Sequence, residues 1–357
     1  MRPRFGIIVV THQSERHVAP LWRSLAATVD PANTAICVVD NGSTDRTVEI
    51  LQEENSRAKL PLQLIRNPDN PGFARANNLA WEFLQVQVSP DIVVLLNPDT
   101  AAQPGWLEAL EHAFEDGTVD AAAPLLLLPD GRINSRGNAL HFLGMGYVQG
   151  LGEDAGQAGT NKPFFSGSGA ALALRATTVA KLDGRFGTKG IFWEELFMYG
   201  EDSDLGWRLR LAGIAPRLVP ASRIVHDYRF PGQGDETRLF WIERNRYLLL
   251  LANFKLPTLL VLLPWIAMSE LALLAGFWKL YPHRLRLWRA VREEAKKEEF
   301  KSHRSRIQQN RLAKDREILR AMTGSIQHGA RPAGVMDRLL DAALRGSHRF
   351  LCALVWW

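Results

Sequence analysis

The chain of 357 residues is poor in cysteine: it has only Cys37 and Cys352, which excludes a disulfide framework and a cysteine-rich zinc site. It also lacks an N-terminal apolar stretch ending in a cleavage site, so no signal peptide is expected. No internal repeat is evident. Hydrophobic residues (46%) and charged residues (23%) are present in ordinary proportions, which indicates one large domain with an appendage, or two domains. These features favour a cytoplasmic enzyme, either free or attached to a membrane.

Basic residues are scarce outside one segment. The net charge is +5, yet residues 279–320 alone hold fourteen Lys and Arg against six Asp and Glu. The remainder of the chain is therefore mildly acidic, with a net charge of −3. This distribution argues against a nucleic-acid partner for the main body and predicts a basic surface near the C-terminus.

Short apolar runs rich in β-branched residues alternate with helical patterns over the first hundred residues. The pattern predicts strands at 5–11, 35–39, 62–66 and 91–96, separated by helices at 17–29, 47 to about 55 and 70 to about 84. Such alternation indicates a Rossmann-like α/β fold, with a mainly parallel sheet flanked by helices. A further strand is expected at 170–175. The glycine-rich segment 137–169 is interpreted either as a mobile lid or acceptor loop, or as an ordinary surface loop.

Acidic residues follow the predicted strands at their carboxyl ends. Asp40 and Asp45 come after the second strand, and Asp99 follows the fourth. Ligands of parallel α/β sheets bind beyond these ends, so the three carboxylates are candidate site residues. Asn97-Pro-Asp99 is also a good turn sequence, which is the alternative interpretation of that motif.

A second acidic group begins a predicted helix. Glu201, Asp202 and Asp204 precede the apolar positions of this helix, and Gly213 stands where it should stop. Crowded carboxylates repel one another and raise the pKa of at least one of them, which suits a general base. The alternative is structural: acids cap helix starts, and Asp204 can pair with Arg208 four residues on.

Four motifs occur in a fixed order along residues 5–250. They read Val-Val-Asp-Asn-Gly-Ser-Thr-Asp (38–45), Asn-Pro-Gly-Phe-Ala-Arg-Ala-Asn-Asn (70–78), Leu-Leu-Asn-Pro-Asp (95–99) and Phe-Met-Tyr-Gly-Glu-Asp-Ser-Asp-Leu (197–205). In combination they resemble the family 2 glycosyltransferases of GT-A fold, particularly their bacterial rhamnosyltransferase-like members. No single motif would be specific enough.

The resemblance implies roles for individual residues. Asp202 would be the catalytic base, with Glu201 beside it at the substrate. A divalent cation, Mg²⁺ or Mn²⁺, would be held by Asp99 and His226, although a lone histidine can equally be structural. The nucleotide of the sugar donor and its diphosphate would be bound by a set of polar residues: Thr11, Asp40, Asp45, Arg75, Asn78 and Asn97.

The sequence departs from the family pattern at some positions. Trp193 replaces an expected aspartate before the base, and it could stack on a sugar ring or belong to the core. In the Arg-Asn-Arg element, Arg244 is assigned to a diphosphate, whereas Arg246 is better explained as a partner of nearby acids. The first strand ends in Thr11-His-Gln, where the family usually has Thr-Tyr-Asn. These differences affect the identity of donor and acceptor.

The chain becomes strongly apolar after the predicted catalytic domain, 1–246. Residues 256–278 carry one charge, Glu270, and two prolines, Pro257 and Pro264, which suits an interfacial or re-entrant helix pair better than a spanning helix. An interfacial aromatic belt is predicted before the basic run, at Trp265, Trp278, Tyr281 and Trp288. A membrane-associating segment, 247–282, and a basic helical region, 283–357, are therefore expected. The alternative is an apolar subdomain or homo-oligomer interface followed by a solvated helix.

These observations favour an inverting, metal-dependent glycosyltransferase at the cytoplasmic face of the cell membrane. It would move a sugar such as rhamnose from a nucleoside-diphosphate sugar to a hydroxyl of a lipid-linked or polysaccharide acceptor, in cell-envelope glycan synthesis. A sugar nucleotidyltransferase is the first alternative, but its glycine-rich triphosphate loop is missing. A non-catalytic membrane-bound scaffold is the second, and the presence of Asp99 and Asp202 argues against it.

Overall fold

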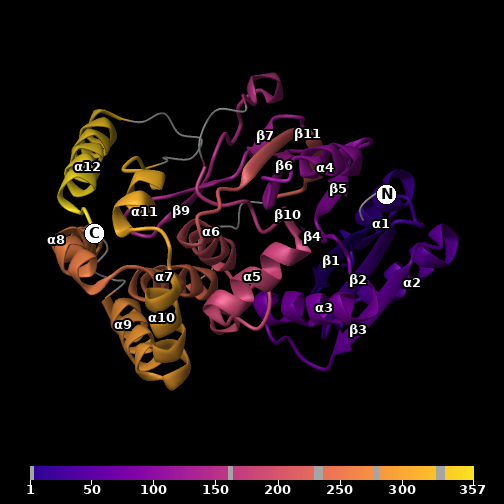
Figure 1. Ribbon diagram of the computed structural model, residues 1–357, viewed down its shortest axis with the longest axis horizontal. Coiled ribbons are helices and arrows are strands. Elements are labelled where there is room, and N and C mark those ends of the chain that lie inside the picture. Colours follow the sequence, from indigo (N-terminus) through magenta and orange to yellow (C-terminus); the bar gives the residue numbers. More distant parts are fainter. Residues whose placement is uncertain (1–3, 160–163, 229–235, 277–280, 327–333) are drawn as a thin grey trace.

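A twisted sheet forms the centre of the molecule, with helices on both faces (Figure 1). The computed structural model describes residues 4–159, 164–228, 236–276, 281–326 and 334–357. The nine strands of this sheet run in the order β3-β2-β1-β4-β10-β6-β11-β5, with β7 paired to β6. Their bounds are β1 Phe5–Thr11, β2 Thr34–Asn41, β3 Leu62–Asn67, β4 Ile92–Leu96, β5 Thr100–Ala102, β6 Ala121–Leu127, β7 Ile133–Ser135, β10 Ala171–Arg175 and β11 Arg217–His226.

The N-terminal half follows the predicted alternation closely. Strands β1 to β4 pair in parallel, and helices connect them: α1 (Val18–Thr28), α2 (Thr47–Ala58) and α3 (Phe73–Gln87). Thr11 lies directly opposite Asp40 in the register of β1 and β2. The carboxyl ends of the two strands therefore bring the first two predicted site residues to one edge of the sheet.

The sheet as a whole is mixed, so the expectation of a mainly parallel sheet was wrong. Strand β10 runs antiparallel to both of its neighbours, β4 and β6, and β5 is antiparallel to β11. Both faces of β10 are covered, so its sequence is an apolar run similar to that of a parallel strand. Such a run indicates burial but does not encode the direction of the strand.

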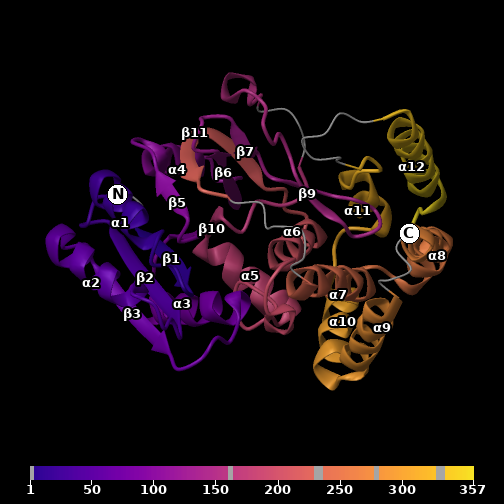
Figure 2. The same cartoon turned by 180° about the vertical axis from the view of Figure 1, so that it is seen from behind.

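Alternating side chains of the central strands feed two separate cores. In β1, Ile7 and Val9 face α1, α2 and α4 (Trp106–Glu115), whereas Ile8 and Val10 face the opposite layer. That layer contains α3, α5 (Ala176–Phe186) and α6 (Glu201–Leu211), and Figure 2 shows it from behind. Because β1 is buried on both faces, every one of its side chains is covered.

The glycine-rich segment is more ordered than either interpretation of it allowed. It contains β8 (Asn138–Leu140) and β9 (Gly146–Val148), which form a separate two-stranded sheet. The preceding strand β7 and all of β8 are buried. The first part of this segment is therefore a packed part of the fold; β7 and β8 deliver one asparagine each, Asn134 and Asn138, to the site described below.

The C-terminal helices pack on the same core as the catalytic part. Leu262, Leu287, Phe300 and Leu351 belong to one buried cluster with Ile8 of the central sheet. The predicted boundary between residues 246 and 247 falls inside a continuous helix, α7. The helices are α7 Glu236–Asn253, α8 Leu256–Gly276, α9 Tyr281–Lys296, α10 Glu298–Asn310, α11 Asp315–Ala321 and α12 Val335–Leu354.

Within the described ranges, no helix is both long and apolar enough to cross a membrane. The one charged residue of the apolar segment, Glu270, turns inward and pairs with Arg284 and Arg246. Trp265 and Trp288 are partly exposed, whereas Trp278 of the predicted aromatic belt lies outside the described residues. The membrane-associating role of this region remains a prediction.

Candidate active site

The first part of the site is a hydrogen-bonded carboxylate at the ends of β1 and β2. The Thr11 hydroxyl donates to Asp40 Oδ1 at 2.9 Å, and both side chains are buried. Ser43 donates twice more, from its backbone N–H to Oδ2 (3.0 Å) and from its hydroxyl to Oδ1 (2.6 Å). The carboxylate is therefore held rigidly, and an ionised carboxylate can still accept a further hydrogen bond from a ligand N–H.

Asp45 has a clear structural task. Its Oδ1 accepts from the backbone N–H (3.1 Å) and the hydroxyl (2.5 Å) of Thr47, so it caps the start of α2. Partial burial raises the pKa of Asp45, but the Thr47 hydrogen bonds outweigh this effect and the net shift is downward. Arg75 lies exposed on α3. The nucleotide roles of these two residues remain predictions.

Asn78 holds two segments together. Its amide donates to the Phe192 carbonyl at 2.8 Å, and its Oδ1 accepts from the Phe192 N–H at 2.9 Å. A further contact, at 3.1 Å, reaches Glu194 Oε1. Both ends of the buried amide are therefore already used by protein, so Asn78 acts on the site through the segment before Asp202.

Asp99 and His226 come together through strand pairing. Antiparallel pairing of β5 and β11 sets His226 opposite Thr100, the residue after Asp99. His226 Nε2 lies 3.3 Å from Asp99 Oδ2. The other ring nitrogen, Nδ1, is 2.9 Å from Asn134 Oδ1, an acceptor, so this contact directs Nε2 toward Asp99.

Three buried atoms in this corner lack a hydrogen-bond partner among the described residues: Asn97 Oδ1, Asp99 Oδ1 and His226 Nε2. A divalent cation satisfies such a set of oxygen and imidazole ligands. Within the described ranges, no group of three or more His, Cys, Asp or Glu could hold a metal by itself. Asp99 and His226 therefore fit a cation whose remaining ligands come from substrate oxygens and water.

Asp202 lies in the first turn of α6 with one oxygen held by two donors. Asn138 Nδ2 donates to Asp202 Oδ2 at 2.9 Å, and the Gly169 N–H donates to the same oxygen at 3.2 Å. The next residue, Ala170, accepts through its carbonyl from the Asn97 N–H at 2.9 Å. The adjacent residues 169 and 170 thus contact the acidic helix start on one side and the Asn97-Pro-Asp99 turn on the other.

Glu201 and Asp202 form a coupled pair of carboxyls. Burial is the main cause that raises the pKa of Glu201 to about 8, and the Asp202 charge adds to it. Burial also raises the pKa of Asp202, against hydrogen bonds from Gly169 and Ser203. The two carboxyls therefore lose their protons one after the other, so one of the pair can be ionised while the other still holds a proton.

The third acid of the group is structural. Asp204 pairs with Arg208 through Oδ2 and Nε at 2.6 Å, and both side chains are fully buried. Arg208 also donates to the Ile191 carbonyl at 2.8 Å. The i,i+4 pair was the alternative interpretation of Asp204, and it is confirmed. The ion pair of Asp204 and Arg208 anchors α6, and Asp202 stays the candidate base.

The loop before Asp202 has an unusual backbone conformation. Phe197 and Tyr199 have φ values of 63° and 64°, which non-glycine residues seldom adopt, and Gly200 follows at 90°. Asn245 of α7 holds this conformation. Its Nδ2 lies 2.8 Å from the Leu196 carbonyl oxygen, 2.9 Å from that of Met198 and 2.6 Å from that of Tyr199.

The same loop contacts the second motif. The Phe197 carbonyl accepts from the Ala74 N–H at 3.2 Å, and a Cβ at Gly72 would lie only 2.5 Å from the Phe197 ring. Asn41, at the end of the first motif, donates to the Gly72 carbonyl at 3.2 Å. The first, second and fourth motifs are therefore joined by direct contacts, and the third joins them through residues 169 and 170.

Two residues assigned to substrate lie in the core instead. Trp193 is 3% exposed and stacks on His303 of α10, with ring centroids 4.2 Å apart, so no face of its ring is open to a sugar. Arg244 is also buried, and its Nη2 pairs with Glu294 Oε2 at 2.7 Å. Internal partners thus replace both the sugar contact of Trp193 and the diphosphate contact of Arg244. Arg246, with Glu243 and Glu270, was interpreted correctly as a paired residue.

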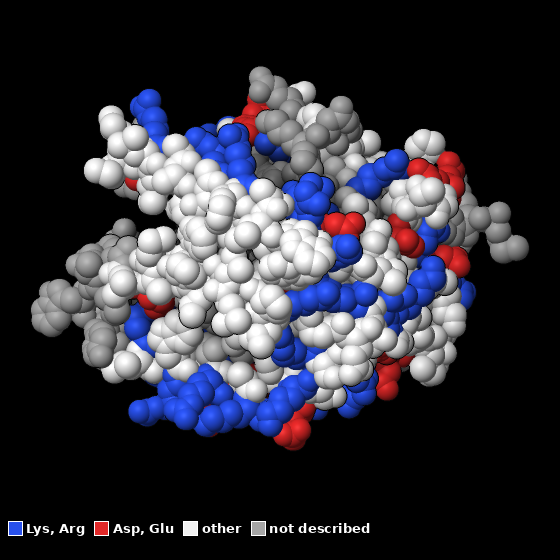
Figure 3. Space-filling model, turned by 60° about the vertical axis from the view of Figure 1, so that its left-hand side comes forward, with Lys and Arg blue, Asp and Glu red and all other residues white. Residues whose placement is uncertain are grey.

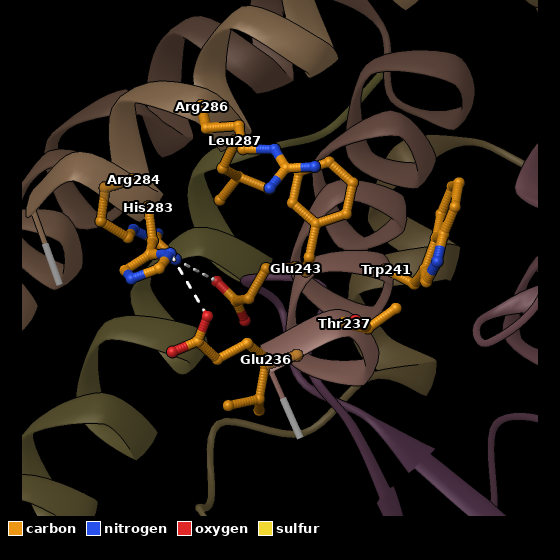
Figure 4. A pocket seen from close by; sticks show the side chains of 10 residues that line it. Glu236, Thr237, Trp241, Glu243, His283, Arg284, Arg286 and Leu287 are labelled. Carbon is orange, nitrogen blue, oxygen red and sulfur yellow. Dashed lines mark hydrogen bonds and ion pairs between the residues drawn. The ribbon is translucent and has the colours of Figure 1, made fainter. Parts of the chain in front are cut away.

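A cavity of about 460 Å³ lies apart from these residues, between α7 and α9. Figure 4 shows Glu236 and Glu243 directed toward His283 and Arg284 in its interior. Apolar side chains form much of the remaining wall: Leu239, Phe240, Trp241 and Leu287. Trp241 also packs against Phe197, with ring centroids 5.0 Å apart. The cavity therefore adjoins the loop that leads to Asp202.

Sequence reasoning missed the residues that hold the ligating and catalytic groups in place: Asn134, Asn138, Gly169 and Asn245. Asn134 and Asn138 are buried although they lie just before and at the start of the glycine-rich segment. Asn245 lies inside the Arg-Asn-Arg element, between Arg244 and Arg246. Asparagines enclosed by apolar or glycine-rich sequence were the available signal.

The fold is similar to that of glycosyltransferases of the GT-A type. Residues 6–177, a little under half of the chain, match the family described as Glycosyl transferase family 2. Asp202 and His226 lie beyond the matched residues.

Relatives and structural neighbours agree with this class. The chain is 28% identical over 196 residues to a pre-mycofactocin glycosyltransferase of Mycobacterium tuberculosis, covering 54% of this chain but only 37% of the relative. It is 27% identical over 245 residues to an N-acetylglucosaminyl-diphospho-decaprenol L-rhamnosyltransferase of the same organism, with 62% and 75% of the two chains covered.

Solved structures extend the likeness of fold into the C-terminal part. A mannosyltransferase from Pyrobaculum calidifontis, in complex with GDP-Man and Mn²⁺, superposes with a TM-score of 0.51 at 17% identity, covering 86% of this chain and 85% of that chain. GalNAc-T7 with UDP, GalNAc and Mn²⁺ gives 0.56 at 16% identity, covering 71% and 48%.

Proposed function

We propose that the protein is an inverting, metal-dependent glycosyltransferase that uses a nucleoside-diphosphate sugar. The acceptor is a hydroxyl of a lipid-linked or polysaccharide glycan of the cell envelope, and rhamnose is the first donor sugar to test. The rhamnosyltransferase relative and the shared family support this choice of chemistry.

One observation carries the proposal: the corner formed by Asn97, Asp99 and His226. It holds three buried atoms that lack a hydrogen-bond partner among the described residues, and His226 is oriented by Asn134. When bound there, a divalent cation would neutralise the negative charge of the diphosphate as the sugar leaves. Two of the structural neighbours were solved with Mn²⁺ and a nucleotide or nucleotide sugar, which supports the same kind of partner here.

The remaining steps belong to the residues of this chain. Asp40 binds the nucleotide base, and the Thr11 and Ser43 hydrogen bonds hold its carboxylate in place for that contact. Asp202 removes the proton of the acceptor hydroxyl through the carboxylate oxygen that Asn138 and Gly169 do not occupy. The acceptor oxygen then attacks the anomeric carbon as the bond to the diphosphate breaks, which inverts the configuration. Proton acceptance by a positioned carboxylate contributes about 10²–10⁴-fold in rate.

The acceptor side is proposed to lie near the loop of Phe197 and Tyr199. Its neighbour Trp241 forms one wall of the cavity between α7 and α9, whose apolar lining suits an acceptor with an apolar portion. A lipid-linked acceptor would place the enzyme at the cytoplasmic face of the membrane as a peripheral or monotopic protein.

The central experiment compares Asp202→Asn with the exposed control Asp30→Asn. Release of nucleoside diphosphate is measured across thymidine, uridine and guanosine sugars, and donor binding is measured by calorimetry. We expect Asp202→Asn to lower transfer by at least about 10²-fold while donor affinity stays within about threefold. Transfer at the wild-type rate would rule out Asp202 as the base.

A further inference from the structure

The outer face of α8 is an uncharged apolar strip. Leu256, Leu260, Leu263, Met268 and Leu271 are each more than half exposed, at 57% to 64%. Glu270, the one charged residue between 256 and 271, pairs inward with Arg284 and leaves the outer face without charge. A row of this length on one helix exceeds the scattered exposed leucines of an ordinary soluble surface.

Helix α12 presents a second apolar strip. Met336, Leu339, Leu340, Phe350 and Leu354 are between 43% and 76% exposed, at the i, i+3, i+4 spacing of one helix face. The polar side chains that face the rest of the protein, Asp341 and His348, are hydrogen-bonded to it.

These inward contacts fix the rotation of α12 about its axis. Asp341 Oδ1 accepts from the Ile326 N–H at 3.0 Å, and His348 Nε2 lies 2.7 Å from the Leu319 carbonyl oxygen. The helix is therefore anchored through its polar side, and its apolar side is directed outward.

The two strips belong to one surface, the α8–α12 face. Trp265 of α8 and Phe350 of α12 have ring centroids 6.5 Å apart, and Trp357 Nε1 donates to Thr258 Oγ1 at 2.9 Å. Leu262 and Val355 are fully buried in the same core cluster. In both ribbon views the C-terminal end of α12 comes close to α8 (Figures 1 and 2).

Exposed basic residues accompany the apolar strips. Arg338, Arg345 and Arg349 lie together on the polar side of α12, at i, i+7 and i+11, and α9 adds exposed Arg289 and Arg292. Figure 3 shows a broad face without Lys, Arg, Asp or Glu, with blue side chains gathered along its lower edge. Apolar strips accompanied by exposed basic residues match a bilayer that contains anionic lipid. A second copy of the chain would oppose like charges, which is unfavourable.

We propose that the α8–α12 face docks in the plane of an anionic lipid bilayer, with the apolar strips at the acyl boundary and the arginines at the headgroups. Trp356, 68% exposed at the end of α12, suits the headgroup level. The inference deepens the proposed function, because it rests on an acceptor at the membrane and names the surface that would bring the enzyme there.

Vesicle flotation of the purified full-length protein tests the proposal. The vesicles are phosphatidylcholine alone, or phosphatidylcholine with about one third phosphatidylglycerol. The face variants are Leu260→Glu with Leu263→Glu, and Met336→Glu with Leu339→Glu. Val86→Glu is the matched control, because Val86 is 71% exposed on α3 in the catalytic part. Circular dichroism confirms that each variant is folded.

We expect the wild type and Val86→Glu to float with anionic vesicles, and each face variant to bind at least about tenfold more weakly. Arg338→Gln with Arg349→Gln should reduce binding to anionic vesicles and flatten its dependence on salt. Two results would overturn the proposal. In the first, the wild type binds anionic vesicles no more strongly than neutral vesicles. In the second, the face variants float like Val86→Glu. Face variants that instead convert a dimer to a monomer would identify the face as an interface between copies.

The experiment distinguishes a failure of the lipid-binding proposal from a failure of the proposed function. Asp202→Asn should float like the wild type, because the base does not lie on the α8–α12 face. Face variants should still hydrolyse or transfer from a soluble donor in solution. Loss of transfer in every variant would therefore count against the proposed function and leave the flotation result intact.

Discussion

The side-chain amide of Asn245 lies 2.6 Å from the carbonyl oxygen of Tyr199, three residues before Asp202. Through this contact, α7 holds the positive-φ backbone that directly precedes α6. Asn245 does not need to touch substrate to matter. It fixes where the first turn of α6, and therefore Asp202, is placed.

Asn245→Ala should lower kcat by about 10–100-fold with little change in donor KM, because misplacement of a reacting group weakens transition-state geometry rather than donor binding. Carbonyls left without a donor should also lower the free energy of unfolding by about 1–3 kcal/mol. Asn253→Ala is the matched control. Asn253 is another buried asparagine of α7, but its Nδ2 donates only within the helix, to the Leu249 carbonyl at 3.0 Å. Equal kinetic effects in both variants would contradict the positioning role.

Asn134 and Asn138 should have separable effects although they lie four residues apart. Asn134→Ala removes the acceptor that orients His226, so metal affinity should fall by about 10–100-fold. Asn138→Ala removes a donor to Asp202 Oδ2, which should raise the pKa of the base and move the acidic limb of kcat/KM to higher pH. Metal titrations and pH profiles of both variants check this, and each serves as the control for the other.

Glu201 should make the protein less stable as the pH rises. The pKa of Glu201 is raised to about 8 from the ordinary value of 4.5, so between these values the folded chain keeps a proton that the unfolded chain releases. The free energy of unfolding should therefore fall by up to about 1.4 kcal/mol per pH unit in this window. Glu201→Gln should flatten the trend in urea unfolding from pH 5 to pH 8. The exposed control Glu49→Gln should keep the wild-type slope.

Arg244 should prove to be a stability residue. Arg244→Ala leaves the buried carboxylate of Glu294 with Lys297, at 3.0 Å, as its remaining cationic contact, so we expect a loss of about 3 kcal/mol in urea unfolding. Donor KM of the folded enzyme should stay within about twofold. Arg46→Ala removes an exposed pair with Glu49 and should cost at most about 1 kcal/mol. A large rise in donor KM would restore the original assignment of Arg244 to the diphosphate.

The strands β1 to β4 were predictable because each is a short, buried, β-branched run set between helical patterns. The direction of β10 was not, since a strand covered on both faces has the same composition whichever way it runs. For the same reason the sequence could suggest α/β layering but not the mixed sheet.

Asp40, Asp99 and Asp202 could be proposed from the sequence because each stands in a recognisable motif, and their roles stay predictions. The site was not predictable where the function of a residue depends on a distant partner. Asn134 meets His226 across 92 residues, and Arg244 meets Glu294 across 50. Neither spacing leaves a local pattern. Trp193 shows the same limit: its aromatic ring suited a sugar, but His303 of a later helix already covers it.

The position of β11 between β6 and β5 has a consequence for any shortened form of the protein. A fragment ending at residue 177 would keep Asp40 and Asp99, yet it would lack the base, the imidazole beside Asp99 and the asparagine that shapes the loop before α6. Such a fragment would keep the predicted nucleotide-binding edge and lack the candidate base. During synthesis on the ribosome His226 can join Asp99 only after β11 has emerged, so metal binding at the proposed cation site would report that β11 has joined the sheet.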